Sequence, residues 1–149
     1  MEKIYIEKAI NHALEKLILS DSDLLIYDAN ERSISHRLAI YLENSFQGWN
    51  VDCEYNRDEH NSKRLQLPPK DTKSDDIEAK TVFPDIIVHK RGTNQNLLVI
   101  EMKKSTNSQG EEGKKFDLQK LKAFKTQLNY KFAIFIELGP KLKTSIEWV

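Results

Sequence analysis

The sequence predicts an α/β sandwich in which helices flank a mixed central β-sheet. Three segments repeat apolar side chains at helical spacing, and four shorter segments are apolar runs or alternate apolar with polar residues, as strands do. A chain of 149 residues suits one domain around one core, and 39% apolar with 31% charged residues is a globular composition. We therefore predict a single domain over residues 1–149.

Two helices are expected first. Residues 2–19 carry an apolar stripe that stops before a turn-rich segment at 20–23, so residues 1–29 should form an N-terminal helical extension. The second helix is expected over residues 31–46, where apolar side chains again share one side and Asn30 suits the N-cap.

Four strands are expected to build the sheet. Residues 50–56 alternate apolar and polar side chains, which is typical of a half-exposed strand. Residues 82–89 and 96–103 are mostly apolar and are joined by a short turn, which favours an antiparallel hairpin. A last buried strand is expected over residues 132–136.

The segments between the strands differ in character. Residues 57–80 are rich in charge and contain two adjacent prolines, so we expect a long polar loop. A linker through Gly110 and Gly113 then leads to a helix over residues 117–129 with its apolar side chains inward. The expected order of elements is therefore α-α-β-β-β-α-β.

Two of the apolar strands contain charged residues. Asp85 lies in the first strand of the expected hairpin, and Glu101 and Lys103 lie in the second. Side chains two apart share a face of a strand, so Glu101 and Lys103 project together, and Asp85 can lie beside them once the strands pair. Buried charges persist only where they pair or bind a cation. The cluster is therefore a candidate divalent-metal site.

A known superfamily shows a similar pattern of residues. The Pro84-Asp85 pair, the Glu101-Met102-Lys103 triplet and the order of elements resemble the PD-(D/E)XK nucleases over about residues 30–138. The resemblance implies a restriction-endonuclease-like three-layer sandwich. It also implies a nuclease that hydrolyses phosphodiester bonds with Mg²⁺, for which Mn²⁺ can substitute.

The resemblance implies a role for each member of the cluster. Asp85, Glu101 and the backbone carbonyl of Met102 would bind the metal ion, which prefers hard oxygen ligands. Lys103 would orient the attacking water and stabilise developing negative charge. In the alternative without a metal, Lys103 neutralises Asp85 or Glu101 in a partly buried salt bridge.

A further acidic residue, Glu31, lies on the second expected helix. It falls near the centre of the stripe formed with Leu38 and Leu42, where a carboxylate is unusual. The resemblance implies that a glutamate in this place reaches the catalytic site and assists a second metal ion. The alternative is an exposed Glu31 that only complements the helix dipole.

Charge is unevenly spread along the chain. The net charge is zero, but the part after residue 100 holds more basic than acidic side chains. A local basic surface suits nucleic acid, although a solvated helix face explains it equally well. Candidate nucleic-acid contacts are Arg37, His36, Lys104 and Lys120, and His89 is expected at the surface. The resembling families favour DNA over RNA.

Composition and length also bear on partners and location. Cutting both strands of a duplex requires successive nicks, a homodimer, for which the helix at 2–19 offers a surface, or a partner protein that supplies target recognition. No apolar run approaches the roughly 18 residues of a membrane helix, and the start lacks a signal pattern, so we expect a cytoplasmic protein without a membrane partner. Two alternatives to an enzyme stay open: a nucleic-acid-binding or regulatory module without turnover, and an unrelated α/β protein with a coincidental motif.

Overall fold

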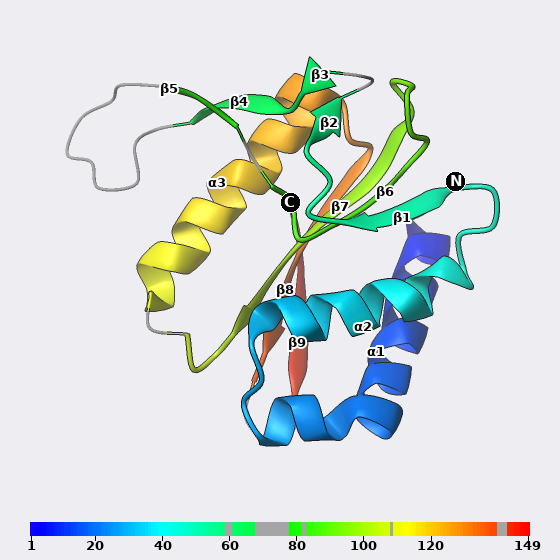
Figure 1. Ribbon diagram of the computed structural model, residues 1–149, viewed down its shortest axis with the longest axis vertical. Helices are drawn as coiled ribbons and strands as arrows, with labels where there is room; N and C mark the ends of the chain where they lie inside the picture. The colour runs from blue at the N-terminus through cyan, green and yellow to red at the C-terminus, as the bar shows by residue number, and fades with distance from the viewer. Residues whose placement is uncertain (59–60, 68–77, 82, 108, 140–142) are drawn as a thin grey trace.

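The computed structural model describes residues 1–149 except 59–60, 68–77, 82, 108 and 140–142. Its helices are α1 (Lys3–Ile26), α2 (Glu31–Glu43) and α3 (Gly110–Leu128), and its main strands are β1 (Asn50–Cys53), β6 (Ile86–His89), β7 (Asn96–Lys104), β8 (Phe132–Leu138) and β9 (Thr144–Trp148). These strands form one sheet in the order β1-β6-β7-β8-β9. The helices α1 and α2 cover one face and α3 covers the other (Figure 1). The predicted α/β class is confirmed.

The sheet is mixed. The strands β1, β6 and β7 are antiparallel neighbours, with Ile86 opposite Ile100, so the predicted hairpin is confirmed. The strands β7 and β8 are parallel, because the chain between them crosses over as α3. At the outer edge, β9 pairs antiparallel with β8. This last strand is missing from the predicted order, although Ile146 and Trp148 alternate with polar residues.

The sheet separates two hydrophobic cores, because successive side chains of a strand point to opposite faces. On β7, Ile100 and Met102 pack beneath α1 and α2, whereas Val99 packs beneath α3. Glu101 and Lys103 share the face of Val99 and are nevertheless buried, with exposures of 2% and 9%. The α3 side of the sheet is therefore where charged groups are buried.

The long polar loop predicted over residues 57–80 is wrong in part, because two short hairpins lie there. The strand β2 (Arg57–Asp58) pairs with β3 (Asn61–Ser62), and β4 (Arg64–Leu67) pairs with β5 (Glu78–Thr81). In β4, Leu65 and Leu67 are buried in the core beneath α3, and the residues that alternate with them face outward. Burial of these two leucines stabilises a strand in a segment whose charge predicts none. The adjacent prolines lie outside the described residues.

Local contacts explain where α2 and α3 begin. The Oδ1 atom of Asn30 accepts a backbone N–H of the first turn of α2 at 2.8 Å, so the predicted N-cap is confirmed. The helix α3 begins at Gly110, well before the predicted start, and includes Gly113. A Cβ added at Gly113 would lie 2.7 Å from Cβ of Gln109 and 3.0 Å from Nζ of Lys103. This glycine therefore lets the first turns of α3 approach β7 closely.

The first helix is longer than predicted. It continues to Ile26, with a non-helical backbone at Asp21 where two helical stretches meet. Leu24 and Leu25, beyond that point, are partly buried against the same core as the first stretch, which explains the continuation. Within the described ranges, no helix combines the length and the apolar character needed to span a membrane.

Candidate functional site

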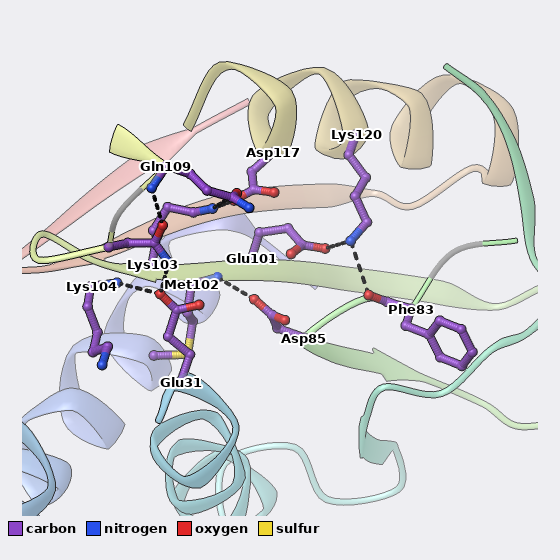
Figure 2. Close-up of polar contacts among 11 residues, drawn as sticks. Glu31, Phe83, Asp85, Glu101, Met102, Lys103, Lys104, Gln109, Asp117 and Lys120 are labelled. Carbon is purple, nitrogen blue, oxygen red and sulfur yellow. Dashed lines mark hydrogen bonds and ion pairs between the residues drawn. The ribbon is translucent and has the colours of Figure 1, made fainter. Parts of the chain in front are cut away.

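Asp85, the residue just before β6, lies close to Glu101 of β7 (Figure 2). Because Ile86 of β6 lies opposite Ile100 of β7, the next pair along the ladder sets Asp85 opposite Glu101. The side chain of Glu101 points to the α3 face of the sheet, as that of Val99 does, whereas the carboxylate of Asp85 reaches the edge of β7. The structure thus brings together the two carboxylates whose strand positions predict such a meeting.

The strand β7 continues beyond the end of β6, so its last N–H groups on that side need other acceptors. The N–H of Met102 donates to Oδ2 of Asp85 at 2.7 Å, and the N–H of Lys104 donates to Oε1 of Glu31 at 3.1 Å. Two carboxylates therefore take the place of a strand. The C=O of a strand residue projects to the same side as its N–H, so the Met102 carbonyl also faces the side of Asp85.

Glu101 carries the most deeply buried carboxylate of the site. Its Oε1 lies 2.8 Å from Nζ of Lys120, which also donates to the backbone oxygen of Phe83 at 3.1 Å. Oε1 accepts no well-directed hydrogen bond from the described residues, so its contact with Lys120 is chiefly electrostatic. Burial, and next the charge of Asp85, hold the pKa of Glu101 well above its ordinary value against the effect of Lys120.

The charge of Asp85 is also compensated only in part. Burial raises the pKa of Asp85, and the hydrogen bond from Met102 and the charge of Lys120 offset this incompletely. Burial by itself would lower the pKa of Lys120, but the contact with Glu101 outweighs it and the pKa is raised. The ammonium of Lys120 therefore faces two carboxylates, of which Glu101 is buried and Asp85 is half-buried.

Lys103 is buried on the same face as Glu101, but its ammonium has another partner. Nζ lies 3.0 Å from Oδ2 of Asp117 and 3.5 Å from Oε1 of Gln109. The salt bridge to Asp85 or Glu101, considered above for a site without a metal, is therefore wrong. Asp117 can form this ion pair with Lys103 because the first turns of α3 lie close to β7.

Asp117 and Lys120 complete the cluster from α3. They share a helix face with Leu121 and Phe124, because residues three and four apart lie on one side of a helix. Asp117 is a functional candidate that is not among the residues predicted above, and its signal in the sequence is a charged residue within an apolar stripe. Lys120 is identified above only as a nucleic-acid contact, whereas its side chain is 13% exposed and contacts Glu101.

Glu31 reaches the end of β7 from the first turn of α2. Its Oε1 accepts the N–H of Lys104 and, at 2.8 Å, an Nδ2–H of Asn107. The side chain is half-buried, so the alternative of an exposed residue that only complements the helix dipole is wrong. This carboxylate contacts amide groups, and its partner on β7 lies two residues beyond the partner of Asp85.

The other predicted nucleic-acid contacts lie on the side of the sheet that α1 and α2 cover. The Nζ atom of Lys104 lies 2.9 Å from Oδ1 of Asp28 and ties the α1–α2 connection to β7. The Nε atom of Arg37 donates to Oδ2 of Asp21 at 3.2 Å and so joins α2 to α1. His36 is exposed on α2. Lys104 and Arg37 therefore have partners within the fold.

His89 is buried, so its predicted surface position is wrong. It is 3% exposed because both faces of β6 are covered, and its Nε2 lies 2.8 Å from Oδ2 of Asp52 on β1. Arg91 donates Nε–H to the same oxygen at 2.8 Å. Burial holds the pKa of His89 below its ordinary value, although Asp52 opposes this. The contact between His89 and Asp52 therefore joins β6 to β1 inside the fold.

The donor atoms that the site could offer to a cation are few. In the part of the chain that the structure describes, no three side chains among His, Cys, Asp and Glu converge as a ligand set. Asp85, Glu101 and the Met102 carbonyl supply oxygen atoms only, which suits Mg²⁺, an ion that keeps several waters.

Comparison of the chain with protein-family models, curated proteins and solved structures found no match.

Proposed function

We propose that this chain is a cytoplasmic, metal-dependent nuclease that hydrolyses phosphodiester bonds of nucleic acid, most simply DNA. The observation that carries the proposal is the pair of carboxylates of Asp85, which is half-buried, and Glu101, which is buried; among the described residues, the ammonium that compensates their charge is that of Lys120. A charge imbalance in a buried cluster costs stability, and such clusters gather at functional sites. A bound cation would restore the balance.

The donor set determines the chemistry. Asp85, Glu101 and the backbone carbonyl of Met102 would hold Mg²⁺, and Mn²⁺ would suit the same oxygen ligands. A bound ion of this kind polarises a phosphate and lowers the pKa of a water bound to it. The pairing of β6 with β7 holds the two carboxylates near each other. It also leaves the ammonium of Lys120 beside them, where negative charge would develop on the phosphate.

The strand order supports the same proposal. The antiparallel strands β1, β6 and β7, the crossover α3 and the parallel strand β8 follow one another as the resemblance to PD-(D/E)XK nucleases implies. We extend the proposal to that restriction-endonuclease-like fold. Under it, the helix α1, the two short hairpins and β9 are additions to a common core.

A pocket beside the first turns of α3 supports a polyanionic substrate. Its charged lining comprises Lys103, Lys104, Lys114, Glu111 and Glu137. Basic side chains exceed acidic ones there by one, which attracts a phosphate only weakly. The proposal therefore includes a second copy of the chain or a partner protein that supplies the rest of the target recognition.

A second candidate function is a nucleic-acid-binding or regulatory module without turnover. The pairing of Lys103 with Asp117 favours it, because the resemblance implies a Lys103 beside Glu101. In such a module, a cation at Asp85 and Glu101 would stabilise the fold without supporting hydrolysis.

Cleavage assays on matched variants separate the two candidates. The wild-type chain, Asp85→Asn and Glu101→Gln are incubated with supercoiled plasmid, single-stranded DNA and RNA in Mg²⁺, Mn²⁺ or EDTA. Glu112→Gln, which removes an exposed carboxylate of α3, is the control. Metal-dependent cutting by the wild type and the control, lost in both site variants, supports the nuclease. Metal-stabilised folding without cutting supports the module, and wild-type rates in a site variant contradict the site.

A further inference from the structure

Two lysines lie near the carboxylate pair, and each contacts a different acidic residue. Lys120 contacts Glu101 at 2.8 Å, and Lys103 contacts Asp117 at 3.0 Å. Along β7 a negative residue is followed two positions later by a positive one, and along α3 a negative residue is followed three positions later by a positive one. The charges of the two elements therefore face each other in opposite order, which specifies both pairs (Figure 2).

We propose that Lys120 of α3, and not Lys103 of β7, supplies the ammonium that compensates the negative charge of the Asp85–Glu101 pair. This inference rests on the proposed function. The Lys120 ammonium contacts Glu101 on β7 and the backbone oxygen of Phe83, two residues before Asp85. It therefore joins the two segments that carry the carboxylates. Only 13% of its side chain is exposed, so its charge acts in a weakly screened environment.

Lys103 is held away from this role by contacts of its own. The side chains of Lys103 and Asp117 are 11% and 12% exposed, so separating them would leave two buried charges without compensation. Gly113 also keeps a space that a Cβ would fill, 3.0 Å from the Lys103 ammonium. The first turns of α3 are thus shaped around a Lys103 that points to Asp117.

The Lys103–Asp117 pair consequently has a positioning role. It fixes the first half of α3 against β7, and Lys120 follows Asp117 by about one helical turn, which sets its ammonium over Glu101. A cation drawn to Asp85 and Glu101 would meet the Lys120 charge there. Removal of this charge should strengthen cation binding and, at the same time, remove the positive group that a reacting phosphate needs.

The test compares Lys120→Met with the double variant Lys103→Met/Asp117→Leu, which removes the neighbouring pair without leaving a single charge. Thermal unfolding is measured during a Mn²⁺ titration without nucleic acid, and cleavage is measured separately. For Lys120→Met we expect half-saturation at several-fold lower Mn²⁺ and cleavage reduced by about 100-fold or more. For the double variant we expect a lower Tm, a shift of the Mn²⁺ midpoint in the same direction but smaller than that of Lys120→Met, and less than a tenfold loss of cleavage.

Two further variants keep the test decisive. Lys120→Arg restores a positive charge and should recover part of the cleavage. Lys103→Arg keeps a positive charge beside Asp117 and should lose less cleavage than Lys120→Met, so it replaces the double variant if that one does not fold. The inference is overturned if Lys120→Met cleaves as the wild type does, or if Lys103→Arg loses as much cleavage as Lys120→Met.

The failure of the inference and the failure of the proposed function give different results. If the wild type shows neither Mn²⁺-dependent stabilisation nor cleavage, the metal centre fails and the inference falls with it. If the wild type binds Mn²⁺ and cleaves, but Lys120→Met leaves both the Mn²⁺ midpoint and the cleavage rate unchanged, the assignment of Lys120 alone is wrong.

Discussion

The Asp85 carboxylate accepts the backbone N–H of Met102 where the end of β6 leaves that amide without a strand partner. Asp85 therefore has two separable properties: an acceptor oxygen that completes the edge of β7, and a negative charge that faces Glu101. An asparagine keeps the acceptor and removes the charge. This separation allows the site to be tested without damage to the sheet.

Asp85→Asn is expected to stabilise the metal-free protein at neutral pH and to abolish its response to Mn²⁺. The variant relieves repulsion between the carboxylates of Asp85 and Glu101, keeps the contact between Glu101 and Lys120, and leaves an acceptor for Met102. For a chain of this size, each kcal/mol gained raises Tm by roughly 2–4 °C. Thermal unfolding in EDTA and in Mn²⁺ measures both effects. A destabilised variant that still responds to Mn²⁺ would contradict this account of Asp85.

Glu31→Ala and Glu31→Gln are expected to separate capping from catalysis. Alanine leaves the N–H of Lys104 and the side-chain amide of Asn107 without their acceptor, at a cost of about 1–3 kcal/mol. Glutamine keeps an acceptor oxygen, so its unfolding free energy in urea should stay close to that of the wild type. Cleavage by Glu31→Gln should then fall by only a few-fold. A complete loss of cleavage in a stable Glu31→Gln would instead support a second metal ion at this carboxylate.

Leu65→Ala is expected to destabilise the protein by roughly 2–5 kcal/mol, because the side chain is fully buried beneath α3. Arg64→Ala, at the preceding exposed position, should change the unfolding free energy by less than about 0.5 kcal/mol. Urea unfolding of both variants gives the comparison. Equal effects at the two positions would show that the β4–β5 hairpin does not pack on the core.

His89 is expected to make stability depend on pH. Its pKa is lowered in the fold by burial, so the unfolded chain binds the proton more readily. The contribution of His89 is therefore complete above the ordinary histidine pKa of about 6.5 and declines as the pH falls from there toward the lower folded value. Asp52, whose pKa burial raises but Arg91 and His89 lower overall, loses its contribution only in more acidic solution.

The measurement is the difference in unfolding free energy between the wild type and His89→Gln from pH 8 to pH 5. Glutamine can donate to Asp52 but does not titrate in this range. The difference should shift in favour of the variant below about pH 6.5, by at most about 1.4 kcal/mol per pH unit. His12→Gln, at an exposed position of α1, is the control. A pH-independent difference for His89→Gln would show that its burial does not affect proton binding.

Much of the fold can be predicted from the sequence, because strong periodicity and local capping determine it. The cap at Asn30 and the antiparallel hairpin of residues 86–104 are examples, and the opposition of Asp85 and Glu101 follows from the alternation of side chains along the two strands. The hairpin formed by β4 and β5 could not be predicted, since only Leu65 and Leu67 mark it within a charged segment.

Which carboxylate each of the two lysines contacts could not be predicted either. Alternation places Lys103 on the face of Glu101, but it does not state which carboxylate lies nearer to the ammonium. That choice depends on how far α3 slides along β7, which is a tertiary property. The sequence does show that Asp117 and Lys120 are charged residues within the apolar stripe of α3, and this marks them as candidates for contacts with the sheet.

The crossover α3 has a consequence for the order of folding. The hairpin of β6 and β7 closes through a short turn, whereas the pairing of β7 with β8 requires the whole of α3 to be brought back onto the sheet. The two carboxylates can therefore meet before Lys120 arrives to neutralise them. Repulsion between the two carboxylates should slow the formation of the β6–β7 hairpin. A divalent cation present during refolding should therefore increase the folding rate as well as stabilise the folded protein.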